Sequence, residues 1–210
     1  MRLILDVENN VTKRGDKQHL DPLEPDNCLV MIGMKTDNWE RVVTFEHSTE
    51  PPTTNGFNLV QEQLDKTTVL VCHNVAHDLI WLWESGFKYD GIVFDTMLGE
   101  YVLQRGQKQP LSLEQCAERY NLDTKKQDTL KEYFKSGTSV SDIPHDELKE
   151  YLLHDLRATF SLADHTHHRF MNGDSDLFDT VTHTNMVAVC LCKIYAVSYT
   201  HLTLPTKRIV

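Results

Sequence analysis

The chain has 210 residues, 40% of them hydrophobic and 25% charged, which is the composition of an ordinary globular protein and predicts one domain with a proper core. The 31 acidic residues outnumber the 21 basic ones, giving a formal net charge of −10. A surface of this sign does not attract polyanions by itself, so a nucleic-acid ligand would need metal ions or a basic neighbouring domain to be held.

The cysteines and the apolar runs predict a cytoplasmic protein. Five cysteines are odd in number and form no CxxC pair, which is typical of reduced thiols rather than of a disulfide framework. The first strand reaches Asp6 too soon for a signal peptide. No stretch approaches the roughly 18 apolar residues of a transmembrane helix, so we expect no membrane partner.

The first half of the chain predicts strands joined by loops. RLILD is a short apolar run typical of a buried strand. The polar stretch NNVTKRGDKQHLDPLEPDN predicts a loop because it contains Gly and Pro. CLVMIGMK and WERVVTFEH, separated by TDN, predict an antiparallel hairpin.

Helices and strands alternate after this hairpin. FNLVQEQLD predicts a short helix and TTVLVC a buried strand, and AHDLIWLWESG has helical apolar spacing that stops at Gly86. GIVFD predicts a last strand, and helices are expected from Thr96 to about Phe170. This order predicts an α/β fold in which helices pack on a mixed sheet of about five strands.

Acidic residues stand at places that such a fold can bring together. Asp6 and Glu8 end the first strand and point to one face, where like charges repel unless a cation lies between them. Asp78 lies on the first turn of the helix after TTVLVC. Tyr151 and Asp155, in the late helix YLLHDLRATFSL, share a helical face. We therefore consider the four carboxylates as one candidate cluster.

Such a cluster suits phosphodiester hydrolysis. Two hard divalent cations, Mg²⁺ or Mn²⁺, roughly 3.5 to 4 Å apart can neutralise the substrate, generate the nucleophile and stabilise the leaving oxygen. Both metals prefer carboxylate and water ligands. A tyrosine one turn from a ligand can orient the attacking water.

The motifs DVE, NVAHD and YLLHD resemble the three exonuclease motifs of the DEDD superfamily of 3′–5′ exonucleases, which read DxE, Nx₃D and Yx₃D. The tyrosine of the third motif is similar to that of the DEDDy branch. The sister branch instead has histidine at the position of Glu150. FDTMLGEYVLQRG and LSLEQCAERYNL, with the lysines that follow, are similar to the proofreading domains of family A DNA polymerases, especially those of phages.

The resemblance implies a ribonuclease-H-like fold and a role for each matching position. Asp6, Glu8 and Asp155 would ligate one metal, Asp6 would bridge to the second, and Asp78 would hold that ion through water. Tyr151 would position the nucleophile. Residues near the substrate would be Asn9, Asn74, His77 and Lys126. His77 departs from the family pattern, because Phe or Tyr usually stands there.

Simpler interpretations exist for single motifs. DxE occurs in solvated loops, Yx₃D on helix surfaces, and Asp78 could cap its helix. Asp95 is interpreted as the N-cap of the next helix rather than as a metal ligand. Arg119, Lys125 and Lys126 are either phosphate contacts or ordinary solvated charges.

The predicted function is metal-dependent removal of nucleotides from the 3′ end of single-stranded DNA, as the proofreading part of a DNA polymerase. Residues 1–170 would form the exonuclease, 171–196 would begin a connector to a polymerase domain, and 197–210 resemble a translated sequencing adapter. The location would be the host cytoplasm if the source is viral. A ribonuclease D-like exoribonuclease and a non-catalytic docking module are the alternatives.

Overall fold

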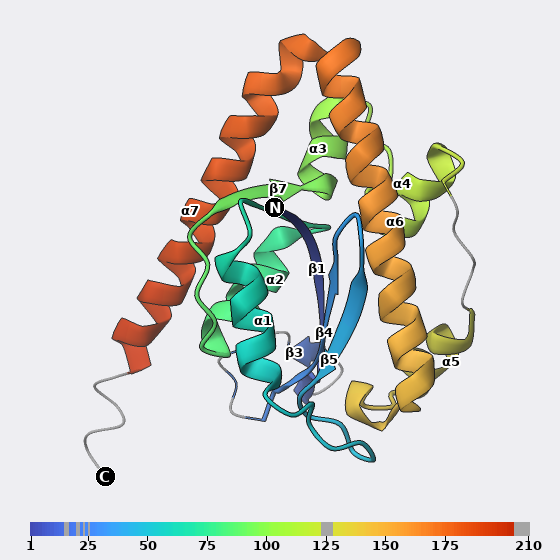
Figure 1. Cartoon of the computed structure of the whole chain (residues 1–210), viewed down its shortest axis with the longest axis vertical. Helices are drawn as coiled ribbons and strands as arrows, with labels where there is room; N and C mark the ends of the chain where they lie inside the picture. The colour runs from blue at the N-terminus through green and yellow to red at the C-terminus, as the bar shows by residue number, and fades with distance from the viewer. Residues whose placement is uncertain (15–16, 20–21, 23, 25, 123–127, 204–210) are drawn as a thin grey trace.

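The computed structural model describes residues 1–14, 17–19, 22, 24, 26–122 and 128–203. Its centre is a five-stranded sheet in the order β5-β4-β1-β6-β7 (Figure 1). β1 (Arg2–Asn9) pairs antiparallel with β4 (Leu29–Lys35) and parallel with β6 (Val69–Cys72). The edges are β5 (Glu40–Thr44) and β7 (Ile92–Asp95). The predicted mixed sheet is confirmed.

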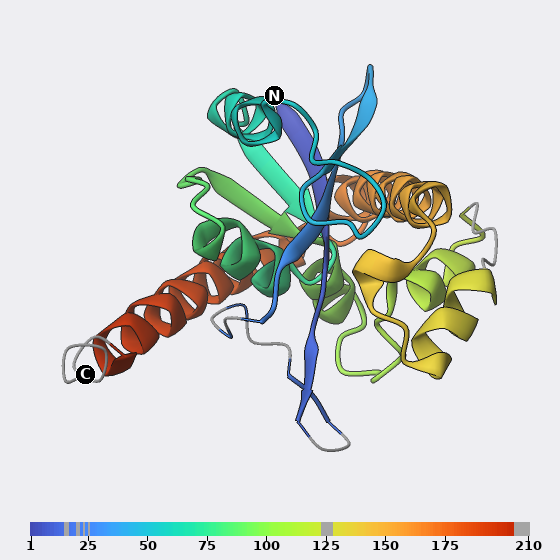
Figure 2. The same cartoon turned by 90° about the horizontal axis from the view of Figure 1, so that it is seen from below.

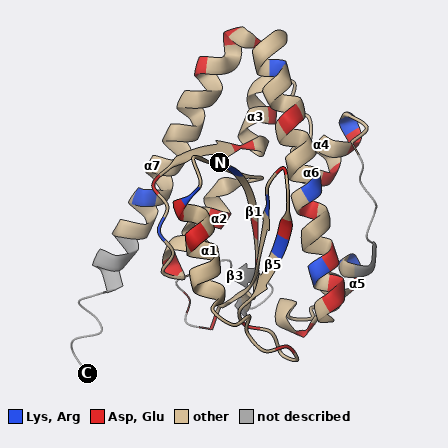
Figure 3. Cartoon of the chain, viewed as in Figure 1, with Lys and Arg blue, Asp and Glu red and all other residues tan. Residues whose placement is uncertain are grey.

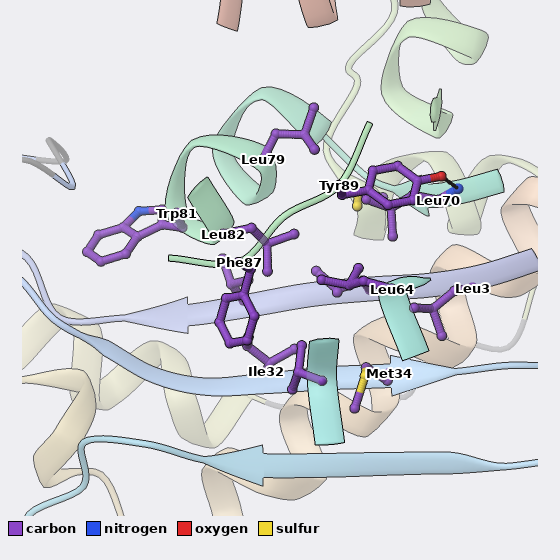
Figure 4. Close-up of a cluster of buried hydrophobic side chains, with 14 of the residues drawn as sticks. Leu3, Ile32, Met34, Leu64, Leu70, Leu79, Trp81, Leu82, Phe87 and Tyr89 are labelled. Atoms are coloured by element: carbon purple, nitrogen blue, oxygen red, sulfur yellow. Dashed lines mark hydrogen bonds between the residues drawn. The ribbon is translucent and has the colours of Figure 1, made fainter. Parts of the chain in front are cut away.

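Helices cover both faces of this sheet. One face packs against α1 (Gly56–Asp65) and α2 (Val75–Glu84) through a buried apolar cluster (Figure 4). The other face packs against α6 (His145–Asn172), where Ile4 contacts the cluster of Leu153 and Leu156. Because side chains alternate along a strand, Asp6 and Glu8 point to the same face as Ile4, toward α6.

The remaining helices follow the predicted order. They are α3 (Thr96–Leu103), α4 (Leu113–Arg119), α5 (Asp128–Ser136) and α7 (Phe178–Thr203), with short 3₁₀ turns at Val140–Asp142 and Ser175–Leu177. Gly86 follows the end of α2 with φ of 91°, a left-handed conformation that favours glycine. Its predicted role in ending that helix is thereby confirmed.

The stretch predicted as one polar loop contains a small hairpin. β2 (Thr12–Arg14) and β3 (Lys17–His19) pair antiparallel as a separate two-stranded sheet. Their sequences, TKR and KQH, are polar at every position. A search for alternating apolar residues therefore finds no strand signal there, and the expectation of a loop is wrong for these residues.

The expectation that no stretch is long and apolar enough to cross a membrane is also wrong. Ser175–Val197, 23 residues with a mean hydropathy of 1.2, meets both criteria by length and composition. Uncharged Thr, His and Asn residues are interspersed among its apolar residues, so the sequence shows no long continuous apolar run there. The helix packs along β7, α2 and α3 (Figures 1 and 2), with Val181, Asn185 and Cys192 buried.

Candidate active site

The end of β1 presents Asp6 and Glu8 to α6. Both side chains are partly buried, and Asp6 lies opposite Gly33 of β4 in the strand register. A methyl group on Gly33 would lie 2.8 Å from Leu152 Cγ and 2.8 Å from Leu156 Cδ1. Glycine at this position thus lets α6 approach the sheet closely. Tyr151 and Asp155, which adjoin those two leucines in the sequence, are thereby held near the β1 carboxylates.

The carboxylates interact electrostatically across three elements. Burial raises the pKa of Asp6 to about 7, and the negative charge of Asp155 adds to this rise. The pKa of Glu8 is raised well above its ordinary range by burial, then by Asp6 and Asp155. Burial and then the charge of Asp6 raise the pKa of Asp78 as well. The sequence-predicted cluster is thus a group of mutually repelling acids that a cation would stabilise.

Tyr151 is suited to donate a hydrogen bond rather than to act as a base. Tyr151 lies one helical turn before Asp155 on α6, so the two side chains share a face of the helix. Burial raises the pKa of Tyr151 strongly, and the charges of Asp155 and Glu8 raise it further. The phenol therefore keeps its proton at neutral pH, when it can orient a neighbouring oxygen.

Asp78 lies on α2, with only 2% of its surface exposed. Its Oδ1 accepts a hydrogen bond from the backbone N–H of Val7 at 3.2 Å. This contact joins α2 to β1 between the two predicted ligands of that strand. The simpler interpretation of Asp78 as a cap of its own helix does not account for this bond, because Val7 belongs to another element.

The donor set fits a hard divalent cation in its chemistry. Carboxylate oxygens are the ligands that Mg²⁺ and Mn²⁺ prefer, and the pKa values of Asp6, Glu8 and Asp78 are raised by burial first and then by the negative charges of neighbouring acids. In the described parts of the chain, no three His, Cys, Asp or Glu side chains are grouped closely enough to form a ready-made ion cage. The carboxylates are close enough to raise one another's pKa values. That they coordinate a metal ion is a proposal.

The four residues predicted to contact substrate differ in their surroundings. Asn9 and His77 meet, because His77 Nε2 donates to Asn9 Oδ1 at 2.9 Å. Burial lowers the pKa of His77, which favours the neutral ring. Asn74 precedes α2 with φ of 74°, and its side chain makes no capping hydrogen bond. Lys126 lies outside the described residues.

Arg119 is engaged within the protein. Its guanidinium donates to Glu100 Oε2 at 2.8 Å, and the Tyr120 hydroxyl donates to the same oxygen at 2.8 Å. The Glu100 side chain is fully buried, so the arginine compensates a charge that would otherwise be costly to bury. This pair gives Arg119 a structural role in joining α3 to α4, rather than that of a free solvated charge.

His73 forms a buried hydrogen-bond network that the sequence did not reveal. Its Nε2 lies 2.8 Å from the Leu111 carbonyl oxygen, and its Nδ1 lies 2.8 Å from Thr96 Oγ1. The carbonyl can only accept, so Nε2 carries the proton of the neutral ring. The Thr96 hydroxyl shares its one proton between Nδ1 and the Cys72 carbonyl oxygen, 3.2 Å from Thr96 Oγ1. The ring thus ties the end of β6 to α3 and to the segment before α4.

This network predicts loss of stability in acid. Burial lowers the pKa of His73, although its bond to Leu111 and the charges of Asp95 and Asp155 oppose that shift. The unfolded chain therefore takes up the His73 proton first as the pH falls, and the free energy of unfolding decreases. Chemical denaturation in EDTA from about pH 7.5 to about pH 5 should cost the wild type more stability than His73→Gln. Parallel curves would contradict this assignment.

Comparison with known proteins assigns a family description to most of the chain. A sequence profile of 3′–5′ exonucleases matches residues 19–168. That range contains Asp78, Tyr151 and Asp155, whereas Asp6 and Glu8 precede it. No curated protein sequence matches the chain.

Several solved structures share the fold. Brucella melitensis NrnC with bound Mg²⁺ is 16% identical, with a TM-score of 0.64 over 95% of this chain and 87% of that one. Trypanosoma brucei RNase D is 18% identical, with a TM-score of 0.66 over 93% and 65%. A Pol1 structure from M. smegmatis with DNA primer-template and dNTP is 16% identical, with a TM-score of 0.62 over 92% and 28%. At these identities the likeness concerns the ribonuclease-H-like fold.

Proposed function

The chain belongs to the 3′–5′ exonuclease family, and from that premise we propose that it removes nucleotides from the 3′ end of single-stranded DNA with two divalent metal ions, Mg²⁺ or Mn²⁺, releasing 5′-mononucleotides. The observation that carries this proposal is the electrostatic coupling of Asp6, Glu8 and Asp155 where β1 faces α6. Carboxylates from a strand and a helix interact there, beside the apolar cluster that contains Ile4 and Leu156.

The protein's own groups have separate tasks in this proposal. Asp6, Glu8 and Asp155 would hold one ion, with Asp6 shared by the second and Asp78 reaching that ion through water. The bound ions would supply charge neutralisation of the phosphodiester and activation of water at neutral pH. Tyr151, which keeps its proton because its pKa is raised and which lies one turn from Asp155, would orient the attacking water.

The acidic surface supports a substrate that enters by one end. Along α6 acidic and basic residues alternate, and most of α7 carries neither kind (Figure 3). With a net charge of −10, long stretches of nucleic acid would be repelled, whereas a frayed end needs only the metal centre. The pair of Asn9 and His77, close to Asp78, would contact the terminal nucleotide.

DNA proofreading remains the first substrate assignment, supported by the similarity of FDTMLGEYVLQRG to proofreading domains. In that case residues 171–196 would lead toward a polymerase domain of the same natural chain, and 197–210 would be foreign sequence. The protein would act in the cytoplasm. The exonuclease chemistry does not depend on these finer assignments.

A second candidate is an exoribonuclease similar to ribonuclease D. The chain matches 84% of an NrnC structure bound to pGG and 65% of the RNase D structure, but 28% of the Pol1 structure. A small free-standing nuclease is therefore as compatible with the fold as a polymerase domain. Discrimination between DNA and RNA depends on contacts near the 2′ position.

Digestion of 5′-labelled single-stranded DNA and RNA by the full chain tests both candidates. In Mg²⁺ or Mn²⁺ we expect a ladder that shortens from the 3′ end, and in EDTA we expect none. Preference for DNA supports proofreading, and preference for RNA supports the second candidate. If the folded protein cleaves neither substrate in Mg²⁺ or Mn²⁺, the proposed function is wrong.

A further inference from the structure

One polar side chain of α7 is buried against the end of the sheet. Asn185 is 4% exposed, and its Oδ1 accepts a hydrogen bond from the backbone N–H of Asp95 at 2.7 Å. Its Nδ2 donates to the Val181 carbonyl at 2.8 Å. A buried amide is costly unless both of its polar atoms are bonded. Here both are, and one bond leaves the helix for the last residue of β7.

Asp95, the residue bonded to Asn185, caps the N-termini of two helices. Asp95 is 2% exposed, and its Oδ1 accepts from the N–H groups of Met97 and Leu98 at 2.9 and 3.4 Å, at the start of α3. The same carboxylate also accepts from Asn74 N–H at 2.9 Å and from Val75 N–H at 3.0 Å, at the start of α2.

This second cap replaces one that α2 lacks. Asn74, the residue at the N-cap position, makes no side-chain capping bond of its own. Its left-handed backbone conformation directs the N–H groups of Asn74 and Val75 to Asp95 instead. The position of α2 therefore depends on where β7 and Asp95 lie. A capping interaction of this kind contributes about 0.5–2 kcal/mol.

The chain of contacts leads from α7 to the metal centre. Asp78 lies on the first turn of α2, close behind this cap, and bonds to Val7 between Asp6 and Glu8. We propose that Asn185 is a positioning residue of the nuclease centre, acting through Asp95 and the start of α2 on Asp78. This inference rests on the proposed function. It extends the functional unit beyond residues 19–168, which match the family.

Asn185→Leu in the full chain is the direct test, because leucine has similar size but cannot accept the Asp95 hydrogen bond. Thr182→Leu is the matched control, since Thr182 is exposed on α7 and bonds within the helix to Phe178. Asn185→Asp keeps an acceptor for Asp95 and serves as the conservative variant. The readouts are the Mg²⁺ concentration for half-maximal activity, kcat, and the Mg²⁺-induced shift in melting temperature.

We expect Asn185→Leu to raise the half-saturating Mg²⁺ concentration, by less than the roughly 10- to 100-fold that follows loss of a direct hydrogen-bond partner of a metal ligand, because Asn185 acts on Asp78 through Asp95 and the start of α2. Asn185→Asp should recover part of this loss, and Thr182→Leu should match the wild type. A lower melting temperature for Asn185→Leu with unchanged Mg²⁺ dependence would overturn the proposal, because that is the result of a merely structural residue.

The thermal measurement separates this inference from the proposed function. If the wild type cleaves no substrate but its Mg²⁺-induced stabilisation is weakened by Asn185→Leu alone, the positioning role stands and the exonuclease proposal fails. If Asn185→Leu does not fold, the melting response of Asn185→Asp decides. A wild type that does not respond to Mg²⁺ would overturn the positioning role too.

Discussion

Asp6→Ala should abolish exonuclease activity and remove the stabilisation that Mg²⁺ gives to the protein. The charge of Asp6 links the carboxylates of two elements, because it contributes to the raised pKa values of Glu8 on β1 and of Asp78 on α2. If Asp6 is shared by two ions, as proposed, its loss should cost at least about a thousandfold in rate, or about 4 kcal/mol of transition-state stabilisation.

The same variant should melt at a higher temperature than the wild type when no metal is present. In the wild type the Asp6 carboxylate is partly buried, and burial together with the charge of Asp155 raises the pKa of Asp6 to about 7. Removing it relieves repulsion among the remaining acids. Activity assays and thermal melts with Mg²⁺ and with EDTA measure both effects.

Asp146→Ala is the control for Asp6→Ala, because the Asp146 side chain is 98% exposed at the start of α6. It should change neither the rate nor the Mg²⁺ response. Retention of normal activity by Asp6→Ala would show that the catalytic centre lies elsewhere, whatever the result of the melts.

Gly33→Ala should destabilise the protein and weaken its metal response together. The added methyl group would lie 2.8 Å from Leu152 Cγ, so the leucine or the whole of α6 must move. Overpacking of this kind typically costs about 1–3 kcal/mol, which lowers the melting temperature by about 2–4 °C per kcal/mol in a protein of this size. Because α6 carries Asp155, its displacement should raise the Mg²⁺ requirement for activity.

Gly173→Ala separates this packing effect from the general effect of replacing glycine. At Gly173 a methyl group would meet nothing closer than the Arg169 carbonyl oxygen at 3.9 Å. Chemical denaturation and Mg²⁺ titration of the two variants should differ in both stability and metal requirement. Equal behaviour would mean that α6 does not need the close approach at Gly33.

The sequence predicted the features that depend on local pattern. The five strands of the main sheet and the apolar face of α2 follow from the spacing of apolar residues. Asp6 and Glu8 were expected on one face because strand geometry alone places them there. Asp95 was expected as the N-cap of α3, and its bonds to Met97 and Leu98 confirm this.

Features that depend on contacts between distant elements were not predictable in the same way. Nothing near Gly33 indicates that Leu152 and Leu156 will pack on it. Asn74 and Val75 lie about 20 residues before Asp95, which caps them. The hairpin of β2 and β3 carries no apolar alternation, so pattern analysis had no signal for it.

The capping of α2 by Asp95 also constrains the order in which a newly made chain can fold. The start of α2 cannot be completed until β7 has left the ribosome, and Asn185 arrives 90 residues after Asp95. Tyr151 and Asp155, on α6, also follow β7 in the chain. In a nascent chain the proposed metal centre therefore stays incomplete until α6 has been made, and the bond from Asp95 to Asn185 of α7 forms later still.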